Sequence, residues 1–220
     1  MDGGGGGPGP QKATAHHFWG NLRDLLERNK PTGRRTKLLG LLVTRPSLDT
    51  FKKEVEPQWD WFHLRSGEAL HVVVLGYGGM DSRGPVRSFS NEWLQAGITA
   101  IQERTNWKYS GESDLLLCNV TYESNDGVRI RISESISITL EAAVKDGLIT
   151  SFSNLLEKIR DYTHSHSGDD LLWGFSDSLA KGSLREALRL MLYSFLPEAL
   201  KAKAKSLEHA AVRNIGRAAS

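Results

Sequence analysis

Two stretches of the sequence, 38–44 and 70–77, are almost wholly apolar and about as long as a β-strand. A continuous apolar run of this length is typical of a strand that is covered on both faces. Each run precedes a helical pattern. Apolar residues share one helical face in 48–56, where Ser47 can act as the N-cap, and again in the segment after Ser90. Two strand–helix units in succession predict parallel strands joined by right-handed crossovers.

A β-hairpin is expected in the middle of the chain. The apolar run 115–122 is followed by the turn sequence Asn-Asp-Gly at 125–127 and by an alternating segment at 128–133. The Asp-Gly pair favours a tight hairpin turn, and the alternation leaves one face of the fourth strand in water. Helical patterns follow at 140–145 and 152–162.

The segments on either side of this core differ from it in composition. Residues 1–15 are rich in glycine and proline and bury too little apolar surface to offset their ordering entropy, so we expect a disordered tail. Apolar residues at helical spacing predict an amphipathic helix over 16–30. We expect one α/β core domain over 37–163 and a C-terminal helical segment over 171–215.

The predicted order of elements is strand, helix, strand, helix, strand, strand, helix. This order resembles the thioredoxin-like fold over residues 37–162, and other α/β folds could share it. The expected fold class is therefore α/β, with a thioredoxin-like mixed sheet, an N-terminal amphipathic helix and a C-terminal helical extension.

The chemical motifs of the thioredoxin-like oxidoreductases do not carry over to this chain. Those enzymes place a CxxC motif after the first strand, where this sequence has Thr44-Arg45-Pro46-Ser47. They also keep a cis-proline before the third strand, where 111–114 contains no proline. The resemblance therefore implies a redox-inactive member. Cys118 lies in an apolar run, so we expect a core residue with a raised pKa and little nucleophilicity.

Composition and charge exclude further classes. The formal net charge of +2 argues against a dedicated nucleic-acid binder, whose basic surface is usually much stronger. A single cysteine excludes an internal disulfide, and the N-terminus shows no signal-peptide pattern, so we expect a reducing, cytoplasmic compartment. The apolar runs are far shorter than the roughly 20 residues of a membrane-crossing helix, so no crossing is expected.

The end of the second apolar strand carries the one suggestive ligand motif. The apolar strand that opens the run 72–81 ends in GxGG at 76–79 and resembles the opening of a dinucleotide-binding loop. Asp81 occupies the third glycine position, where its carboxylate would repel phosphate, and Pro85 prevents an immediate helix. A flexible loop explains the sequence better, but a ligand site in 76–84 stays an alternative. Its candidate residues are Gly76, Tyr77, Gly78 and Gly79.

Metal and catalytic sites are not expected. Four potential ligands lie within seven residues: His164, His166, Asp169 and Asp170. A polar linker between the core and the C-terminal helical segment explains these residues better, because a metal site needs ligands that converge in space. The sequence contains no GxSxG, P-loop or HExxH motif. We therefore expect no catalytic residues, no metal and no cofactor.

Surplus apolar side chains mark the candidate partner surface. The helix over 16–30 can dock on its own core or on another chain, and two tryptophans spaced by two cannot share a helical face. The candidate residues are Phe18, Trp19, Leu22, Leu25, Trp59 and Trp61. We expect a non-catalytic module that acts by protein–protein interaction, as an adaptor or regulatory subunit, with a protein partner or a second copy of itself. The alternative is an enzyme, or a protein that binds a small molecule or nucleotide, using the 76–84 loop.

Overall fold

The structure is a computed structural model of the chain. It describes residues 14–58, 69–77, 80–81, 84–85, 88–123, 127–132, 135–146, 149–165, 171 and 212–215. Residues 1–13 of the expected tail and 172–211 of the expected C-terminal segment lie outside this description.

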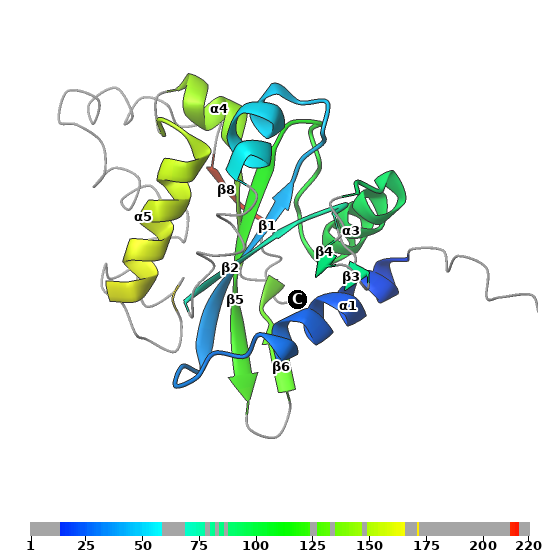
Figure 1. Ribbon diagram of the computed structural model, residues 1–220, viewed down its shortest axis with the longest axis vertical. Helices are drawn as coiled ribbons and strands as arrows, with labels where there is room; N and C mark the ends of the chain where they lie inside the picture. The colour runs from blue at the N-terminus through cyan, green and yellow to red at the C-terminus, as the bar shows by residue number, and fades with distance from the viewer. Residues whose placement is uncertain are drawn as a thin grey trace, which may run out of the picture.

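A mixed sheet of six strands forms the centre of the molecule (Figure 1). Its strands are β1 (Thr36–Val43), β2 (Leu70–Val74), β5 (Asp114–Glu123), β6 (Gly127–Ile130), β7 (Ile136–Thr139) and β8 (Val212–Asn214). The strands run in the order β2-β1-β5-β7-β8, and β6 pairs with the same edge of β5 as β7 does. With several helices around it, this sheet confirms the expected α/β class.

The first two strands run in parallel, as their apolar runs predict. Leu38 lies opposite Leu70, and Leu42 lies opposite Val74. The expected hairpin is present, since β6 pairs with β5 in the antiparallel direction. Its first strand, β5, also pairs with β1 in the antiparallel direction, so the second strand–helix unit does not lead into a third parallel strand. From Asp114 to Val120 every residue of β5 is buried. A strand with no polar face is covered best inside the sheet, so β5 takes the position between β1 and β7.

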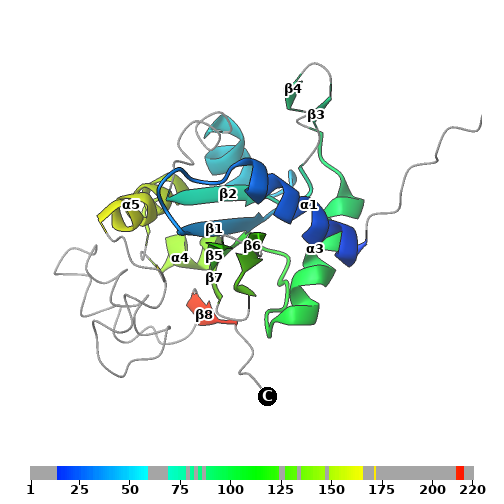
Figure 2. The ribbon, with the colours of Figure 1, turned by 90° about the horizontal axis from the view of Figure 1, so that it is seen from below.

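Helices cover both faces of the sheet (Figures 1 and 2). On one face lie α1 (Ala15–Arg28) and α3 (Asn91–Arg104), whose apolar residues pack with Leu39, Leu41 and Val43 of β1. On the other lie α4 (Leu140–Lys145) and α5 (Phe152–Ser165), which pack with Leu38 and Leu42. Successive side chains of β1 point to opposite faces, so one apolar strand supplies both cores.

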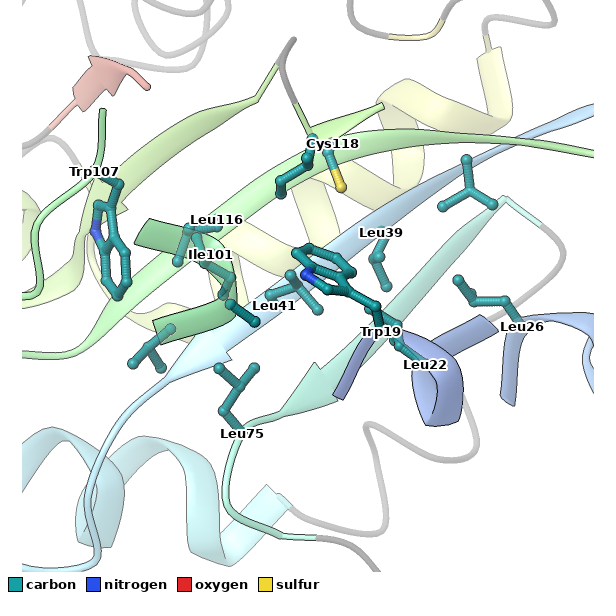
Figure 3. Close-up of a cluster of buried hydrophobic side chains, with 14 of the residues drawn as sticks. Trp19, Leu22, Leu26, Leu39, Leu41, Leu75, Ile101, Trp107, Leu116 and Cys118 are labelled. Carbon is teal, nitrogen blue, oxygen red and sulfur yellow. The ribbon is translucent and has the colours of Figure 1, made fainter. Parts of the chain in front are cut away.

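The N-terminal helix docks on its own sheet. Thr14 caps α1 by accepting a hydrogen bond from the His17 amide. Trp19, Leu22 and Leu26 are buried, and Figure 3 shows Trp19 and Leu22 pointing toward β1 and β5. The helix over 16–30 could have docked on its own core or on another chain, and in the structure it docks on its own core. The helix is part of the same core as the sheet.

The connection between β1 and β2 differs from the predicted helix over 48–56. It holds a π-helical turn, η1 (Phe51–Val55), followed directly by a 3-10 turn, η2 (Glu56–Gln58). Ser47 does not cap it: the N-cap is Thr50, which forms no side-chain capping bond. Pro57 gives a physical reason, because proline lacks an N–H and its ring would clash with the carbonyl group four residues earlier in a regular helix, that of Lys53.

Two further elements were not predicted. Within the glycine-rich loop, β3 (Met80–Asp81) and β4 (Gly84–Pro85) form a separate antiparallel pair. Near the end of the chain, where a helix is expected up to residue 215, β8 pairs with β7 instead. The Ile215 amide donates to the Ser135 carbonyl oxygen at 3.0 Å, and the Ile215 side chain is buried. In the described part of the chain, no helix is long and apolar enough to cross a membrane.

Candidate functional site

Polar side chains gather where β1 ends. Because β1 and β2 are parallel, their carboxyl ends lie at the same edge of the sheet, which is where open α/β sheets usually bind ligands. The antiparallel strand β5 begins at this edge, with Asp114 opposite Val43. We call the group of residues found here the carboxyl-end cluster. Its members are Thr44, Arg45, Trp107, Tyr109, Ser113, Asp114, Thr139 and Glu141.

Asp114 is a buried carboxylate with two hydrogen-bond donors. The Trp107 indole Nε1 donates to Oδ2 at 3.1 Å, and the Thr139 hydroxyl donates to Oδ1 at 2.6 Å. Burial raises the pKa of Asp114 above its ordinary value, and the two hydrogen bonds oppose this rise. The nearby Glu141 raises the pKa further. Asp114 therefore holds Trp107 and Thr139 in place, with each of its oxygens accepting one hydrogen bond.

Thr44, Ser113 and Glu141 tie β1, β5 and α4 together. The hydroxyl oxygens of Thr44 and Ser113 lie 2.9 Å apart in a buried hydrogen bond. The Ser113 amide donates to Glu141 Oε2 at 2.8 Å, and the Leu140 amide donates to the Ser113 carbonyl oxygen at 2.8 Å. One oxygen of Glu141 is thus used to fix the start of β5 to the first turn of α4.

Arg45 and Tyr109 lie face to face, with the guanidinium carbon 5.6 Å from the centre of the ring. Burial raises the pKa of the Tyr109 phenol, Arg45 lowers it, and the carboxylates of Asp114 and Glu141 raise it. A basic group and two acidic groups therefore all lie within electrostatic range of one phenol.

Three polar atoms of the cluster are covered and lack a well-aligned hydrogen bond. They are Arg45 Nε, the Tyr109 hydroxyl oxygen and Glu141 Oε1. Each belongs to a side chain that is only partly buried as a whole. The Arg45 and Tyr109 side chains nevertheless lie close enough for a hydrogen bond between them to lower the pKa of the phenol.

Thr44 and Arg45 of the cluster belong to the segment Thr44-Arg45-Pro46-Ser47, which contains no cysteine. Cys118, the single cysteine of the sequence, lies further along β5 on the face that α1 covers (Figure 3). It is 1% exposed, and burial raises its pKa to about 12. As predicted, Cys118 is a core residue, and at neutral pH its thiol does not ionise.

The two described glycine-loop candidates are used for packing. Gly76 has a φ of +83°, and a Cβ placed on it would lie 2.7 Å from the Phe89 ring. Tyr77 stacks on Phe51 with ring centres 5.5 Å apart, and burial with a smaller effect of Glu56 raises its pKa to about 12. The glycine is therefore explained by its conformation and by the neighbouring ring. Gly78 and Gly79 lie outside the described residues.

The candidate partner residues differ in how deeply the structure buries them. Trp19 and Leu22 are each 4% exposed and belong to the core. Phe18 and Leu25 are half-buried, and the Phe18 ring packs closely against Gly97 of α3. Trp59 and Trp61 lie outside the described residues. A partner surface formed by Trp19 and Leu22 would require α1 to leave the sheet.

Of the four potential metal ligands, the structure describes only His164. This residue is exposed, and its Nδ1 lies 3.0 Å from the Arg160 carbonyl oxygen. His166, Asp169 and Asp170 lie outside the described residues. Within the stretches that the structure describes, no three His, Cys, Asp or Glu side chains are placed to hold a metal ion.

No motif in the sequence marks the carboxyl-end cluster as a site. Arg45 and Asp114 carry a recognisable pattern, because each is a charged residue directly at the end of an apolar strand. Tyr109 and Glu141 carry none: they lie in separate segments and meet only when β5 and β7 pair. Their approach depends on the position of β5 between β1 and β7, inside the sheet, which the sequence pattern did not predict.

Comparison of the chain with protein-family models, with curated proteins and with solved structures found no match. What bears on function is therefore the geometry of the carboxyl-end cluster, in particular its charged side chains and their burial.

Proposed function

We propose that this chain is a non-catalytic, redox-inactive thioredoxin-like module that binds a protein partner, as an adaptor or regulatory subunit in a reducing, cytoplasmic compartment. The proposed binding surface lies at the end of the sheet formed by the carboxyl ends of β1 and β2. The fold part of the proposal is supported by the parallel pair β1–β2 and by the antiparallel addition of β5 and β7 on the other side of β1.

One observation supports the proposal that the chain binds a protein partner at this surface. The segment after β1, where redox members have reactive sulfur, holds a partly exposed Arg45 against the ring of Tyr109. Arginine and tyrosine are enriched among the residues that dominate protein–protein binding energies. Tyr77, also partly exposed, follows the end of the neighbouring strand β2. The position that would serve thiol chemistry thus presents side chains suited to recognition.

The redox half of the proposal is tested by an insulin-disulfide reduction assay with dithiothreitol as electron donor. We expect the rate to equal that of dithiothreitol alone, because a thiol with a pKa of about 12 supplies almost no thiolate at pH 7. Reduction above this background that disappears in Cys118→Ala would contradict the proposal.

The binding half is tested by quantitative affinity purification with the full chain, followed by direct binding of each enriched protein in purified form. Removing a central arginine at an interface commonly costs 2 kcal/mol or more, so Arg45→Ala should weaken binding at least about 30-fold. The matched control is Lys53→Ala, which removes an exposed positive charge from η1. Equal binding by Arg45→Ala and the control would reject this surface.

A further inference from the structure

The connection between α1 and β1 concentrates positive charge at one end of the molecule. Between residues 28 and 48 the sequence contains six basic residues and no acidic one. Four of the six lie within 28–35, which we call the basic loop: Arg28, Lys30, Arg34 and Arg35. Figure 1 shows this connection at the lower end of the sheet, with α4 and the carboxyl end of β1 at the upper end. The basic loop therefore lies away from the carboxyl-end cluster.

Contacts with three other elements hold the basic loop in place. The Arg34 guanidinium donates from Nη1 to the Thr163 carbonyl oxygen at 2.9 Å, which ties the loop to the last turn of α5. Arg35 directly precedes β1, and its carbonyl oxygen accepts from the Tyr122 amide of β5 at 2.8 Å. Between the end of α1 and these contacts, Pro31 is buried. The exposed side chains of the loop therefore project from a fixed position.

The charges of the basic loop are accessible to a partner. Arg28, Lys30 and Arg35 are exposed, and Arg34 is half-buried. Among the residues that the structure describes, none of the four forms an ion pair with an acidic side chain. Arg28 uses Nε to bind the Asp24 carbonyl oxygen at 3.1 Å, which leaves its other N–H groups available. A partner can therefore reach these groups without any rearrangement of the loop.

The acidic residues around the basic loop leave its excess of positive charge in place. The carboxylates of Asp161 and Glu123 each pair with a neighbouring arginine, at 2.9 Å and 3.8 Å. Glu27 points toward the turn between β5 and β6, since its Oε1 would lie 2.8 Å from a Cβ placed on Gly127. That leaves Asp24, one turn before the end of α1, beside four basic side chains.

The number and kind of these groups favour an acidic peptide over a nucleic acid. A surface that makes about six to ten phosphate contacts to DNA needs more basic groups than these four. Single-stranded nucleic acids are bound largely by stacking on aromatic side chains, and the basic loop contains no aromatic residue. A short acidic peptide makes smaller demands, because each arginine fork matches one carboxylate.

We propose that the basic loop binds an acidic, extended segment of a protein partner, as a second interaction surface at the opposite end of the sheet from the carboxyl-end cluster. Carboxylates of that segment accept hydrogen bonds from the Arg28 and Arg35 guanidinium groups and from the Lys30 ammonium group. Arg34 keeps its bond to the Thr163 carbonyl oxygen and positions the loop. A chain with a separate surface at each end of its sheet can hold two partners at once.

The test is an NMR titration of the isotopically labelled full chain with N-acetylated, C-amidated hexaglutamate. At about 20 mM NaCl we expect saturable amide shifts within 28–35 and a dissociation constant on the order of 0.1–1 mM, because exposed ion pairs are individually weak. At about 300 mM NaCl the dissociation constant should rise at least about fivefold, because salt screens exposed charges. Equal loop shifts with neutral hexaglutamine, or no saturable shift with hexaglutamate up to about 10 mM, would overturn the inference.

Two double variants locate the binding. Lys30→Gln combined with Arg35→Gln removes two of the four basic groups, so hexaglutamate should bind at least about threefold more weakly. Lys52→Gln combined with Lys108→Gln is the matched control, because it removes the same charge from exposed positions outside the loop. All four positions are exposed, so both proteins should keep the amide spectrum of the folded chain. Equal weakening by the two double variants would mean that net charge alone explains the binding, and would reject the basic loop.

Two further measurements separate this inference from its neighbours. Hexathymidylate, a single-stranded DNA with a similar number of charges, should bind no more tightly than hexaglutamate, and binding at least about tenfold tighter would reassign the loop to nucleic acids. Arg45→Ala should leave hexaglutamate binding unchanged, since Arg45 lies at the other end of β1. Weaker binding by Arg45→Ala than by the control would contradict a second, separate surface. The carboxyl-end surface is judged by its own partner-binding experiment, so either proposal can fail without the other.

Discussion

At the scale of single residues, Asp114 has the most buried carboxylate of the carboxyl-end cluster, at 2% exposure. Its burial would be costly without partners, because desolvation disfavours the charged form. The donors come from different segments, Trp107 after α3 and Thr139 at the end of β7. The cost of burying one carboxylate is thus partly offset by hydrogen bonds that hold two neighbouring segments against β5.

Thr139→Val should lower the free energy of unfolding by about 1–3 kcal/mol, because Asp114 Oδ1 loses its donor while staying buried. The Thr139 hydroxyl forms no capping bond to α4, so no helix cap is lost. Urea unfolding at pH 7 measures the effect. Thr99→Val, at an exposed position of α3, is the control and should change the value by less than about 0.5 kcal/mol. A loss in Thr139→Val no larger than this would mean that the bond to Asp114 adds nothing.

Residue roles that depend on local sequence could be predicted. Ser90 caps α3 by accepting from the Trp93 amide, as its place before a helical pattern indicates. Cys118 is buried with a raised pKa, as its apolar surroundings in the sequence suggest. Tyr109 and Glu141 could not be assigned, since neither their position nor their neighbours in the sequence distinguish them from other surface residues. Their chemistry comes from tertiary contacts.

At the scale of elements, α1 belongs to the fold and is held in three ways. Its apolar face covers β1 and β5, with Trp19 beneath the Arg104 guanidinium at 4.6 Å from the ring centre. The Tyr122 hydroxyl lies 3.4 Å from the Leu26 carbonyl oxygen. At Gly97 of α3 the Phe18 ring packs so closely that a Cβ there would lie 3.2 Å from it. A helix held in this way covers the sheet, and its release would expose the core.

Trp19→Ala should therefore destabilise the whole domain by about 3–5 kcal/mol, the usual cost of removing a large buried aromatic side chain. Circular dichroism and tryptophan fluorescence during urea unfolding should show one shared transition, shifted to lower urea. His16→Ala, at an exposed position of the same helix, is the control. An unchanged unfolding midpoint in Trp19→Ala would mean that α1 is an independent appendage.

Strand existence could be predicted more reliably than strand placement. The apolar runs locate β1, β2 and β5 because a run of that length fits only a buried strand or helix. Their directions depend on which edges pair, and no pattern within β5 distinguishes a parallel from an antiparallel neighbour. Residues 212–214 were predicted as part of the helical segment over 171–215. They pair with β7 instead, and nothing in their own sequence indicates this partner.

At the scale of the whole molecule, ionisable groups buried in the core make stability depend on pH at the alkaline end. Burial raises the pKa of Cys118 to about 12, and burial with a smaller effect of Glu27 raises that of Tyr122 to about 12. The unfolded chain releases these protons at lower pH than the folded chain does. The folded state then binds more protons, so the stability due to these groups is complete below about pH 8 and is lost as pH rises toward 12.

We expect Cys118 alone to contribute a fall in the free energy of unfolding of about 1.4 kcal/mol per pH unit between about pH 9.5 and pH 11. Urea unfolding at half-unit intervals measures the slope. Cys118→Ala lowers stability at pH 8 through a small cavity, but its slope above pH 9.5 should be shallower than that of the unmodified chain. Parallel slopes for the two proteins would show that Cys118 ionises equally in both states.

The pairing of β7 with β8 has a consequence for folding during synthesis. The ribosome completes β1, β2, β5 and β7 long before it reaches Val212, so the outer edge of β7 stays unpaired until β8 has been made. Uncovered strand edges invite pairing with neighbouring chains. A premature stop codon shortly before Val212 should therefore yield a translation product that is recovered in inclusion bodies, even though every other described strand is already present.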